Sequence, residues 1–264
     1  MAPYDFDAPD ADVILRSSDG KELRVHRLIL SLASPVFQGM FSLPQPTEPP
    51  SQIPNVDVPE SSDILQPFIQ YIYPRSPPKI SDISMWAALY TMADKYNAEA
   101  VADSLRDMLI PRFLEASPLR VYALASHWGF EGEAKAASRG TLTMDISKGL
   151  PEEDARLMGG VACQKLYLLH IQRRDKARAL VDEHPHQFTK RACGCPLMDF
   201  DVVIQRLSKR LATRPWLTAE ELSEEVGDTT DQIRLCVSCC GASKNMHIWS
   251  SSFLKAISEL PQTI

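Results

Sequence analysis

The side chains best suited to chemistry in this sequence are four cysteines in two short segments. Cys193 and Cys195 are separated by one glycine, and Cys236 and Cys239 by two residues. Four thiolates brought to tetrahedral distance would bind a structural Zn²⁺. Such a site is closed, so it would stabilise the fold without making the chain an enzyme.

A second interpretation leaves these cysteines reduced and partly buried, and the sequence favours it. The spacing of Cys193 and Cys195 is shorter than zinc loops usually have, and Cys240 adds a rival thiolate. His184 and His186 lie just upstream as further candidate ligands. The N-terminus lacks a secretory signal, so we do not expect disulfides. We therefore expect no cofactor, with structural zinc as the alternative.

Nucleophilic catalysis has little support in the sequence. The candidate pairs are Cys163 with His170 and Cys240 with His247, but neither has an identifiable partner to orient the histidine. Cys163 lies in an apolar helical pattern, where cysteine is usually a small hydrophobic residue. The chain also has no G-x-S-x-G motif and no glycine-rich phosphate loop. We expect no enzyme.

His26 and Arg27 are the other residues that could do chemistry, in the stretch VHRLILSLASPVFQGMF. A lone histidine between a strand and an apolar helix is more often a hydrogen-bonded structural residue than a base or ligand. Helical spacing predicts a helix over residues 27–33. Ser34 and Pro35 predict the N-cap and first position of a second helix. Its apolar stripe should enter the core: Val36, Phe37, Met40 and Phe41.

A β-hairpin should precede these helices. A three-residue loop ending at Gly20 places apolar residues of the two strands opposite each other, whereas a two-residue loop would pair leucine with arginine. The predicted pairs are Val13 with Val25, Leu15 with Leu23, and Arg16 with Glu22.

Helices dominate the rest of the chain. After a proline-rich loop and a short edge strand at 56–60, one helix should end before Pro74 and another should begin at Ser81. A third should bury Val101, Leu105 and Met108, and Pro111 should bend or end it. Further helices are expected at 117–130, 131–144, 150–184 as one helix or two, 199–212, and 218–226 with a capping box from Thr218 to Glu221.

The order of these elements resembles the BTB (POZ) domain. The segments DADVIL, VHRLILSLASPVF, GMF, FIQYIYP and LYTMADKYNAEAV resemble motifs of that family in the family's order, over roughly residues 10 to 112. The resemblance implies a protein-interaction module that self-associates, and an adaptor role toward a cullin-type ubiquitin ligase or a transcriptional co-regulator. Residues 117–135 are also similar to a segment of short fungal BTB proteins.

The resemblance also assigns roles to particular residues. It implies a homodimer surface on the first helix, at Leu28, Ile29 and Leu32, and a charged pocket formed by Asp12 and Arg27. The nearest match to the cullin-contact motif is Thr47 and Glu48, where Pro46 replaces the expected apolar residue. This departure argues against cullin binding. The alternative is a BTB fold without cullin binding, whose C-terminal region binds a partner through the zinc site.

Fold class and organisation follow from these elements. We expect an α+β fold, a short sheet covered by helices, and then a helical, cysteine-bearing region. The expected divisions are a flexible tail at 1–9, the BTB domain at 10–115, a helical extension at 116–185 and the cysteine-bearing region at 186–264.

Charge and hydropathy limit the partners to proteins. The net charge is −6, and acids outnumber bases in residues 1–150, which disfavours nucleic-acid binding. The basic run at 172–178 encloses an acid and is interpreted as a solvated helix face. No apolar run is long enough to cross a membrane, so an intracellular protein of the cytoplasm or nucleus is expected.

Overall fold

The computed structural model describes residues 6–43, 53–183, 200–225 and 240–264, without the side chains of 183, 200–202 and 240–248. The chain forms two compact units, Met1–Phe113 and Leu114–Ile264. The first is α+β and the second is helical where it is described. The sequence places the helices of 116–185 and those of 186–264 in two separate regions. In the structure they belong to one unit, because the helices after residue 199 pack on the helix at 152–183.

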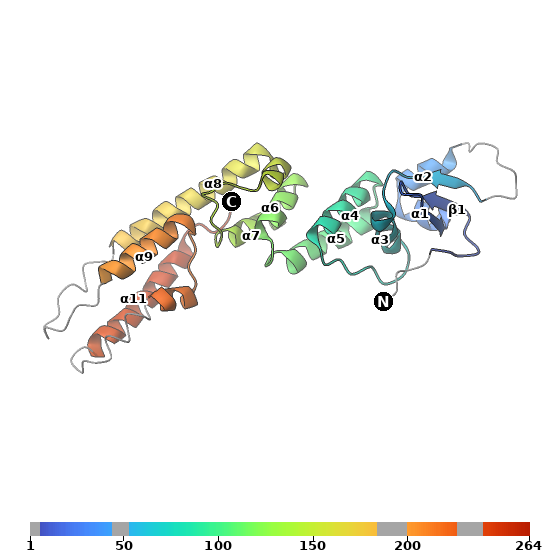
Figure 1. Ribbon diagram of the computed structural model, residues 1–264. Coiled ribbons are helices and arrows are strands. Elements are labelled where there is room, and N and C mark those ends of the chain that lie inside the picture. Colours follow the sequence, from blue (N-terminus) through green and yellow to red (C-terminus); the bar gives the residue numbers. More distant parts are fainter. Residues whose placement is uncertain (1–5, 44–52, 184–199, 226–239) are drawn as a thin grey trace. The chain divides into compact units, whose positions relative to one another are not determined.

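The N-terminal unit contains a mixed three-stranded sheet in the order β2-β1-β3 (Figure 1). Its strands are β1 (Val13–Arg16), β2 (Glu22–Val25) and β3 (Asn55–Asp57). The predicted hairpin register is confirmed, with Val13 opposite Val25 and Leu15 opposite Leu23. Gly20 has a φ of 82°, the left-handed conformation that the three-residue loop requires. Strand β3 adds to β1 in parallel, at the edge of the sheet.

Five helices accompany this sheet: α1 (Arg27–Ala33), α2 (Pro35–Ser42), α3 (Ser62–Ile72), α4 (Ile83–Lys95) and α5 (Glu99–Phe113). The largest side chain that they bury completely is Trp86, whose Nε1 donates to the Leu105 carbonyl at 2.7 Å. The predicted end of α3 before Pro74 is confirmed. The sequence thus places the main elements of this unit correctly.

Several details of these helices differ from prediction. Helix α4 is capped by Asp82, whose carboxylate accepts from the Ser84 N–H at 3.1 Å, and does not begin at Ser81. Helix α5 does not end at Pro111 but continues through it to Phe113. Val101 and Leu105 are buried as predicted, but the next fully buried residue is Leu109 and not Met108.

The expected core stripe of α2 is also wrong in part. Phe37 is its one buried residue, and Val36 is 37% exposed. Adjacent helical positions point about 100° apart, and α2 has only the Phe37 side turned into the core. Val36 is therefore left at the surface.

The N-terminal segment differs from the expected flexible tail where it is described. Phe6 is buried, and its ring meets that of Tyr73 edge to face at 5.5 Å. The Phe6 carbonyl accepts from the Arg24 N–H at 2.9 Å, and Asp7 pairs with the Arg24 guanidinium at 3.7 Å. This segment therefore lies against the outer side of β2.

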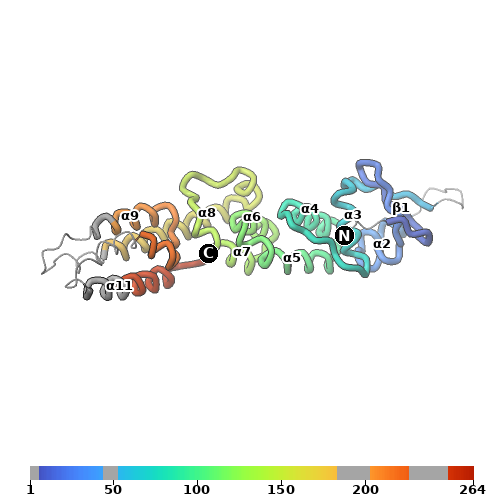
Figure 2. The backbone as a smooth tube through the Cα atoms, turned by 60° about the horizontal axis from the view of Figure 1, so that its bottom comes forward, coloured from blue at the N-terminus to red at the C-terminus, as the bar shows by residue number. Residues whose placement is uncertain are grey.

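The helices of the C-terminal unit are α6 (Pro118–His127), α7 (Glu131–Thr141), α8 (Glu152–Glu183), α9 (Phe200–Thr213) and α11 (Cys240–Glu259), with a further helix over 219–225. Helix α8 is two helices joined at Gly159, whose φ of 74° and ψ of 168° interrupt the helical backbone. Figures 1 and 2 show its second part beside α9 and α11. Side chains from these three helices form one core, which includes Val181, Leu207 and Phe253.

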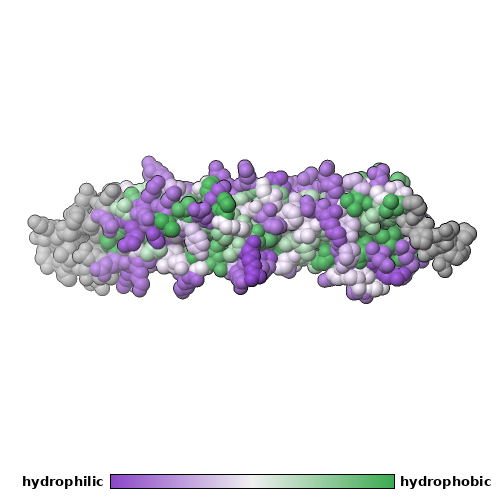
Figure 3. All heavy atoms as spheres, turned by 90° about the horizontal axis from the view of Figure 1, so that it is seen from above, coloured by the Kyte–Doolittle hydropathy of each residue, from purple (hydrophilic) through white to green (hydrophobic). Residues whose placement is uncertain are grey.

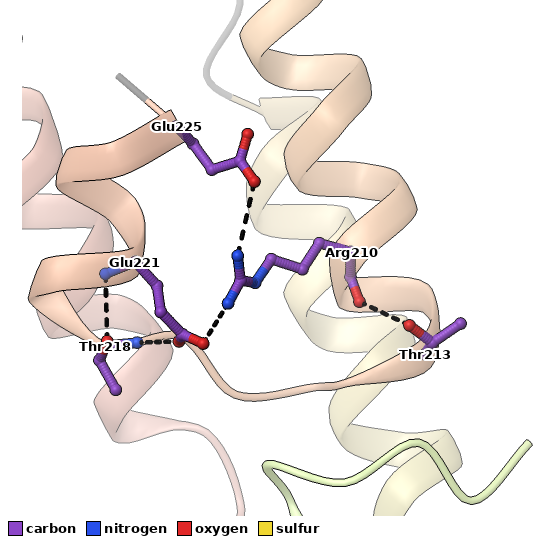
Figure 4. Close-up of polar contacts among 5 residues, drawn as sticks. All are labelled: Arg210, Thr213, Thr218, Glu221 and Glu225. Atoms are coloured by element: carbon purple, nitrogen blue, oxygen red, sulfur yellow. Dashed lines mark hydrogen bonds and ion pairs between the residues drawn. The ribbon is translucent and has the colours of Figure 1, made fainter. Parts of the chain in front are cut away.

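The predicted capping box at Thr218 is confirmed and is tied to α9 (Figure 4). The Thr218 hydroxyl accepts from the Glu221 N–H at 3.1 Å, and the Glu221 carboxylate accepts from the Thr218 N–H at 2.9 Å. Glu221 also pairs with Arg210 of α9, which contacts Glu225 at 3.5 Å. One arginine therefore links α9 to both ends of the described part of this helix.

No helix in the described parts of the chain is both long and apolar enough to cross a membrane.

Candidate functional site

Apolar side chains are exposed along α1 and α2 of the N-terminal unit. Leu28 and Leu32, one helical turn apart on α1, are 69% and 81% exposed. Val36 is the second residue of α2, and Leu43, which caps the C-terminus of α2, is 63% exposed. We call these four residues the α1–α2 apolar surface, and Figure 3 shows hydrophobic residues exposed over this part of the unit. Exposed apolar residues gathered in this way often mark an interaction site.

Two of the three predicted dimer residues belong fully to this surface. Leu28 and Leu32 face solvent, whereas Ile29 is half-buried at its border. Leu30 is the buried residue of α1 and packs in the core. Helix α1 is thus held by one side chain and offers its opposite face to solvent.

His26 fixes the start of α1 and acts as a structural residue, as the sequence indicated. Its backbone N–H donates to the Tyr73 hydroxyl at 2.9 Å, and its Nδ1 lies 2.9 Å from the same oxygen. Its Nε2 lies 3.4 Å from a carboxylate oxygen of Asp10. Both ring nitrogens therefore have partners: Tyr73 joins the hairpin end to the C-cap of α3, and Asp10 joins it to the segment before β1.

Asp12 and Arg27 meet, but through the Arg27 backbone. The Asp12 carboxylate accepts from the Arg27 N–H at 2.8 Å and supplies the N-terminal cap that the His26 side chain does not provide. The Arg27 guanidinium lies over the Phe41 ring, 5.7 Å from its centre. Its buried Nε has no hydrogen-bond partner among the described residues. Asp12 therefore positions α1, while Arg27 covers an aromatic ring of α2.

Ser34 connects the α1–α2 pair to the core. Its fully buried hydroxyl accepts from the Phe37 N–H at 3.1 Å and donates to the Tyr96 carbonyl at 2.5 Å. The Tyr96 ring stacks on Phe37 with centres 4.6 Å apart. Burial and the hydrogen bond to Glu60 raise the pKa of Tyr96 above its usual value, so the hydroxyl stays protonated. The helices that carry the α1–α2 apolar surface are thus held in place by the contacts of Ser34 and Phe37 with Tyr96.

The remaining candidate residues fall in two groups. Thr47 and Glu48, with Cys193, Cys195, Cys236 and Cys239, lie outside the described residues. Cys163 is half-buried and reduced, with its Sγ 3.7 Å from the Ala155 carbonyl. The His170 ring contacts the Thr141 hydroxyl at 3.0 Å, so it is engaged away from the proposed nucleophile. The contacts described for Cys163 and for His170 are therefore with other groups and not with each other.

Arg173 is the residue whose role sequence reasoning missed. It was interpreted as part of a solvated basic face, but it is fully buried in the C-terminal unit. Its guanidinium donates to four backbone carbonyls at 2.5–2.9 Å: those of Pro215, Ile257, Leu260 and Pro261. A detectable signal was its spacing, four residues after the buried Leu169 and four before Ala177.

Burial sets the protonation of this region. Burial, and then the charge of Arg139, lower the pKa of Arg173 to about 10, so the side chain remains a cation at neutral pH. The ring of Trp216 offsets part of the cost of burying these cations. Its centre lies 4.8 Å from the guanidinium of Arg173 and 5.5 Å from that of Arg139. Burial, and then the charge of Arg173, lower the pKa of His170 to about 4, so this ring stays neutral. The cluster has a structural arrangement, with its donors directed at backbone oxygens.

Comparison with known families matches residues 8–112 to the BTB/POZ domain. A search of curated proteins found no match to the chain. The matched range agrees with the N-terminal unit, its small mixed sheet and its five helices. The exposed apolar residues of α1 and α2 lie inside this range, and the domain is a protein–protein interaction module. The N-terminal unit of this chain is therefore a member of the BTB/POZ domain family.

Proposed function

We propose that this chain is a non-catalytic interaction protein that self-associates through the α1–α2 apolar surface. The observation that carries the proposal is the exposure of Leu28 and Leu32 on a helix whose other face is fixed in the core. Burying a leucine side chain contributes roughly 1.5–3 kcal/mol, and a symmetric contact counts each residue twice. Pairing two copies of this surface would therefore lower the free energy by burying the leucine side chains of both copies.

The proposal extends to the role of the second unit. BTB domains have protein partners, so a chain with a BTB domain and a separate helical unit can join two partners as an adaptor. A cullin scaffold or a transcriptional co-regulator is the partner class that the family resemblance suggests for the first unit. For a cullin, Thr47 and Glu48 would make the contact, and for a dimer, Asp12 and Arg27 would line its charged base. Capture of the full chain with cullin and co-regulator proteins, identified by mass spectrometry, tests this assignment.

Charge introduced into the α1–α2 apolar surface should break the dimer. We expect Leu28→Asp or Leu32→Asp to weaken self-association by about a hundredfold or more, because each copy would bury an unpaired carboxylate. Light scattering across a concentration series measures this change. Leu168→Asp is the matched control, since Leu168 is an exposed leucine of α8 in the other unit. Equal dissociation of variants and control, or no dissociation of either, would contradict the assignment of this surface.

The cysteines of the C-terminal unit give a separate prediction. We expect the purified chain to hold no stoichiometric zinc under reducing conditions, because the C-x-C spacing and the extra Cys240 favour reduced thiols. Elemental analysis by mass spectrometry measures the metal content. Zinc at one ion per chain, lost in Cys193→Ser or Cys236→Ser but kept in Cys163→Ser, would instead establish the zinc-bearing alternative.

A further inference from the structure

A pocket of about 500 Å³ lies in the C-terminal unit, between α6, α7 and the middle of α8. Figure 2 shows these three helices next to one another. Its inner wall is apolar and includes the buried side chains of Phe130, Ala134 and Met158. Pockets that hold ligands commonly have about this volume and a mainly apolar wall with a few polar groups.

Two cations stand at the mouth of this pocket. Lys135 comes from α7 and Lys165 from α8, and both are exposed. Within the described parts of the chain, neither ammonium group has a hydrogen bond or ion pair. Among the described residues that line the pocket, Glu131 is the one acidic side chain and Lys135 and Lys165 are the two basic ones, so these side chains together carry a net positive charge. An anionic group placed over an apolar contact would complement this arrangement.

The pocket wall already includes an aliphatic side chain from a segment without helix or strand structure. Ile264 lines the pocket, and residues 261–264 have no helix or strand structure. The Ile264 N–H donates to the Ser138 hydroxyl at 3.3 Å, and Arg173 holds the Pro261 carbonyl at 2.9 Å. The site therefore accommodates an irregular peptide backbone whose apolar side chain contributes to the pocket wall while 38% of it stays exposed. Val161, which is 70% exposed, extends the apolar contact beyond the mouth.

We propose that this pocket binds a short segment of a partner protein that presents an apolar side chain next to a carboxylate. The apolar side chain lies against Phe130, Ala134 and Met158, and the carboxylate lies near the ammonium groups of Lys135 and Lys165. All the described residues that line the pocket belong to the C-terminal unit, so the proposal does not depend on self-association through the BTB domain. It supplies the adaptor with a recognition site of its own.

Peptide selection on the full chain tests the ligand class. A random peptide library is selected on the immobilised protein, and the affinity of the most enriched peptide is measured by fluorescence anisotropy. We expect enriched sequences in which Leu, Ile, Phe or Trp lies next to Asp or Glu. A library without enrichment, or with enriched sequences lacking acids, would overturn the proposal.

Charge reversal then tests the site. We expect Lys135→Glu and Lys165→Glu each to weaken peptide binding by roughly fivefold, and more so at low salt. Lys176→Glu on α8 is the matched control, because Lys176 is exposed and does not line the pocket. Val161→Asp should also weaken binding, and circular dichroism confirms that the variants fold.

Two results would contradict the site. One is peptide affinity that is the same in the lysine variants and in the control. The other is a change in the mass of the chain itself when Lys135 and Lys165 are reversed together, which would make a second copy the occupant. Because Leu28→Asp leaves this pocket intact, its peptide affinity separates failure of this proposal from failure of the dimer.

Discussion

Replacing Arg173 with alanine is expected to lower the free energy of unfolding of the C-terminal unit by about 3–5 kcal/mol. The substitution removes a fully buried side chain and leaves four backbone carbonyls without their guanidinium donor. A buried polar group that loses its partner costs about 1–3 kcal/mol, and the cavity adds to that cost. The effect is large because this one side chain joins α8 to Pro215, to α11 at Ile257 and to the segment that follows α11.

Urea unfolding followed by circular dichroism measures this loss. Arg174→Ala is the matched control, because Arg174 is the next residue and pairs at the surface with Asp175 at 2.9 Å. Its removal should change the unfolding free energy by less than about 0.5 kcal/mol. Lysine at position 173 should not restore stability, since it lacks the planar fork that reaches several carbonyls. An Arg173→Ala variant as stable as Arg174→Ala would contradict the assigned role.

Replacing Ser34 with alanine is expected to lower the free energy of unfolding of the BTB domain by about 2–3 kcal/mol. The loss of an N-cap costs about 1 kcal/mol, and the buried Tyr96 carbonyl would also lose its donor. Because Ser34 joins α1 to α2, the variant should also loosen the base of the α1–α2 apolar surface. Self-association should then weaken together with stability.

Thermal and urea unfolding of Ser34→Ala test this prediction against Ser42→Ala. Ser42 belongs to the same helix, is exposed, and donates to the Gly39 carbonyl at 2.8 Å. Its replacement should be within about 0.5 kcal/mol of the parent protein. Equal stability of the two variants would show that the Ser34 hydroxyl does not hold the helix pair.

Local patterns predicted the hairpin and the caps at Ser34 and Thr218 because these features depend on residues close in sequence. The strand register follows from pairing apolar residues on one face, with Val13 opposite Val25. The start of α2 follows from Ser34 as the N-cap and Pro35 as the first helical residue. Met108 and Leu109 could not be separated in this way, since both are apolar and the choice depends on the helix packed against them. Arg173 shows the same limit more strongly, because its carbonyl partners lie 42 to 88 residues away.

The sequence also predicts the α1–α2 apolar surface only in part. Helical spacing and the family resemblance indicated Leu28 and Leu32, which are exposed, but Ile29 is half-buried. Val36 was expected in the core and Leu43 was not considered, because a short helix next to a loop gives no sign of which side is covered. The pocket near Lys135 and Lys165 could not be foreseen, since it forms where three helices meet at the Gly159 kink.

The mass of the full chain in solution tests the central claim most directly. Sedimentation equilibrium at micromolar concentration should give twice the 29.5 kDa of one chain, and Leu28→Asp should return it to the mass of one. A parent protein that sediments as a single chain at these concentrations would contradict self-association through the α1–α2 apolar surface.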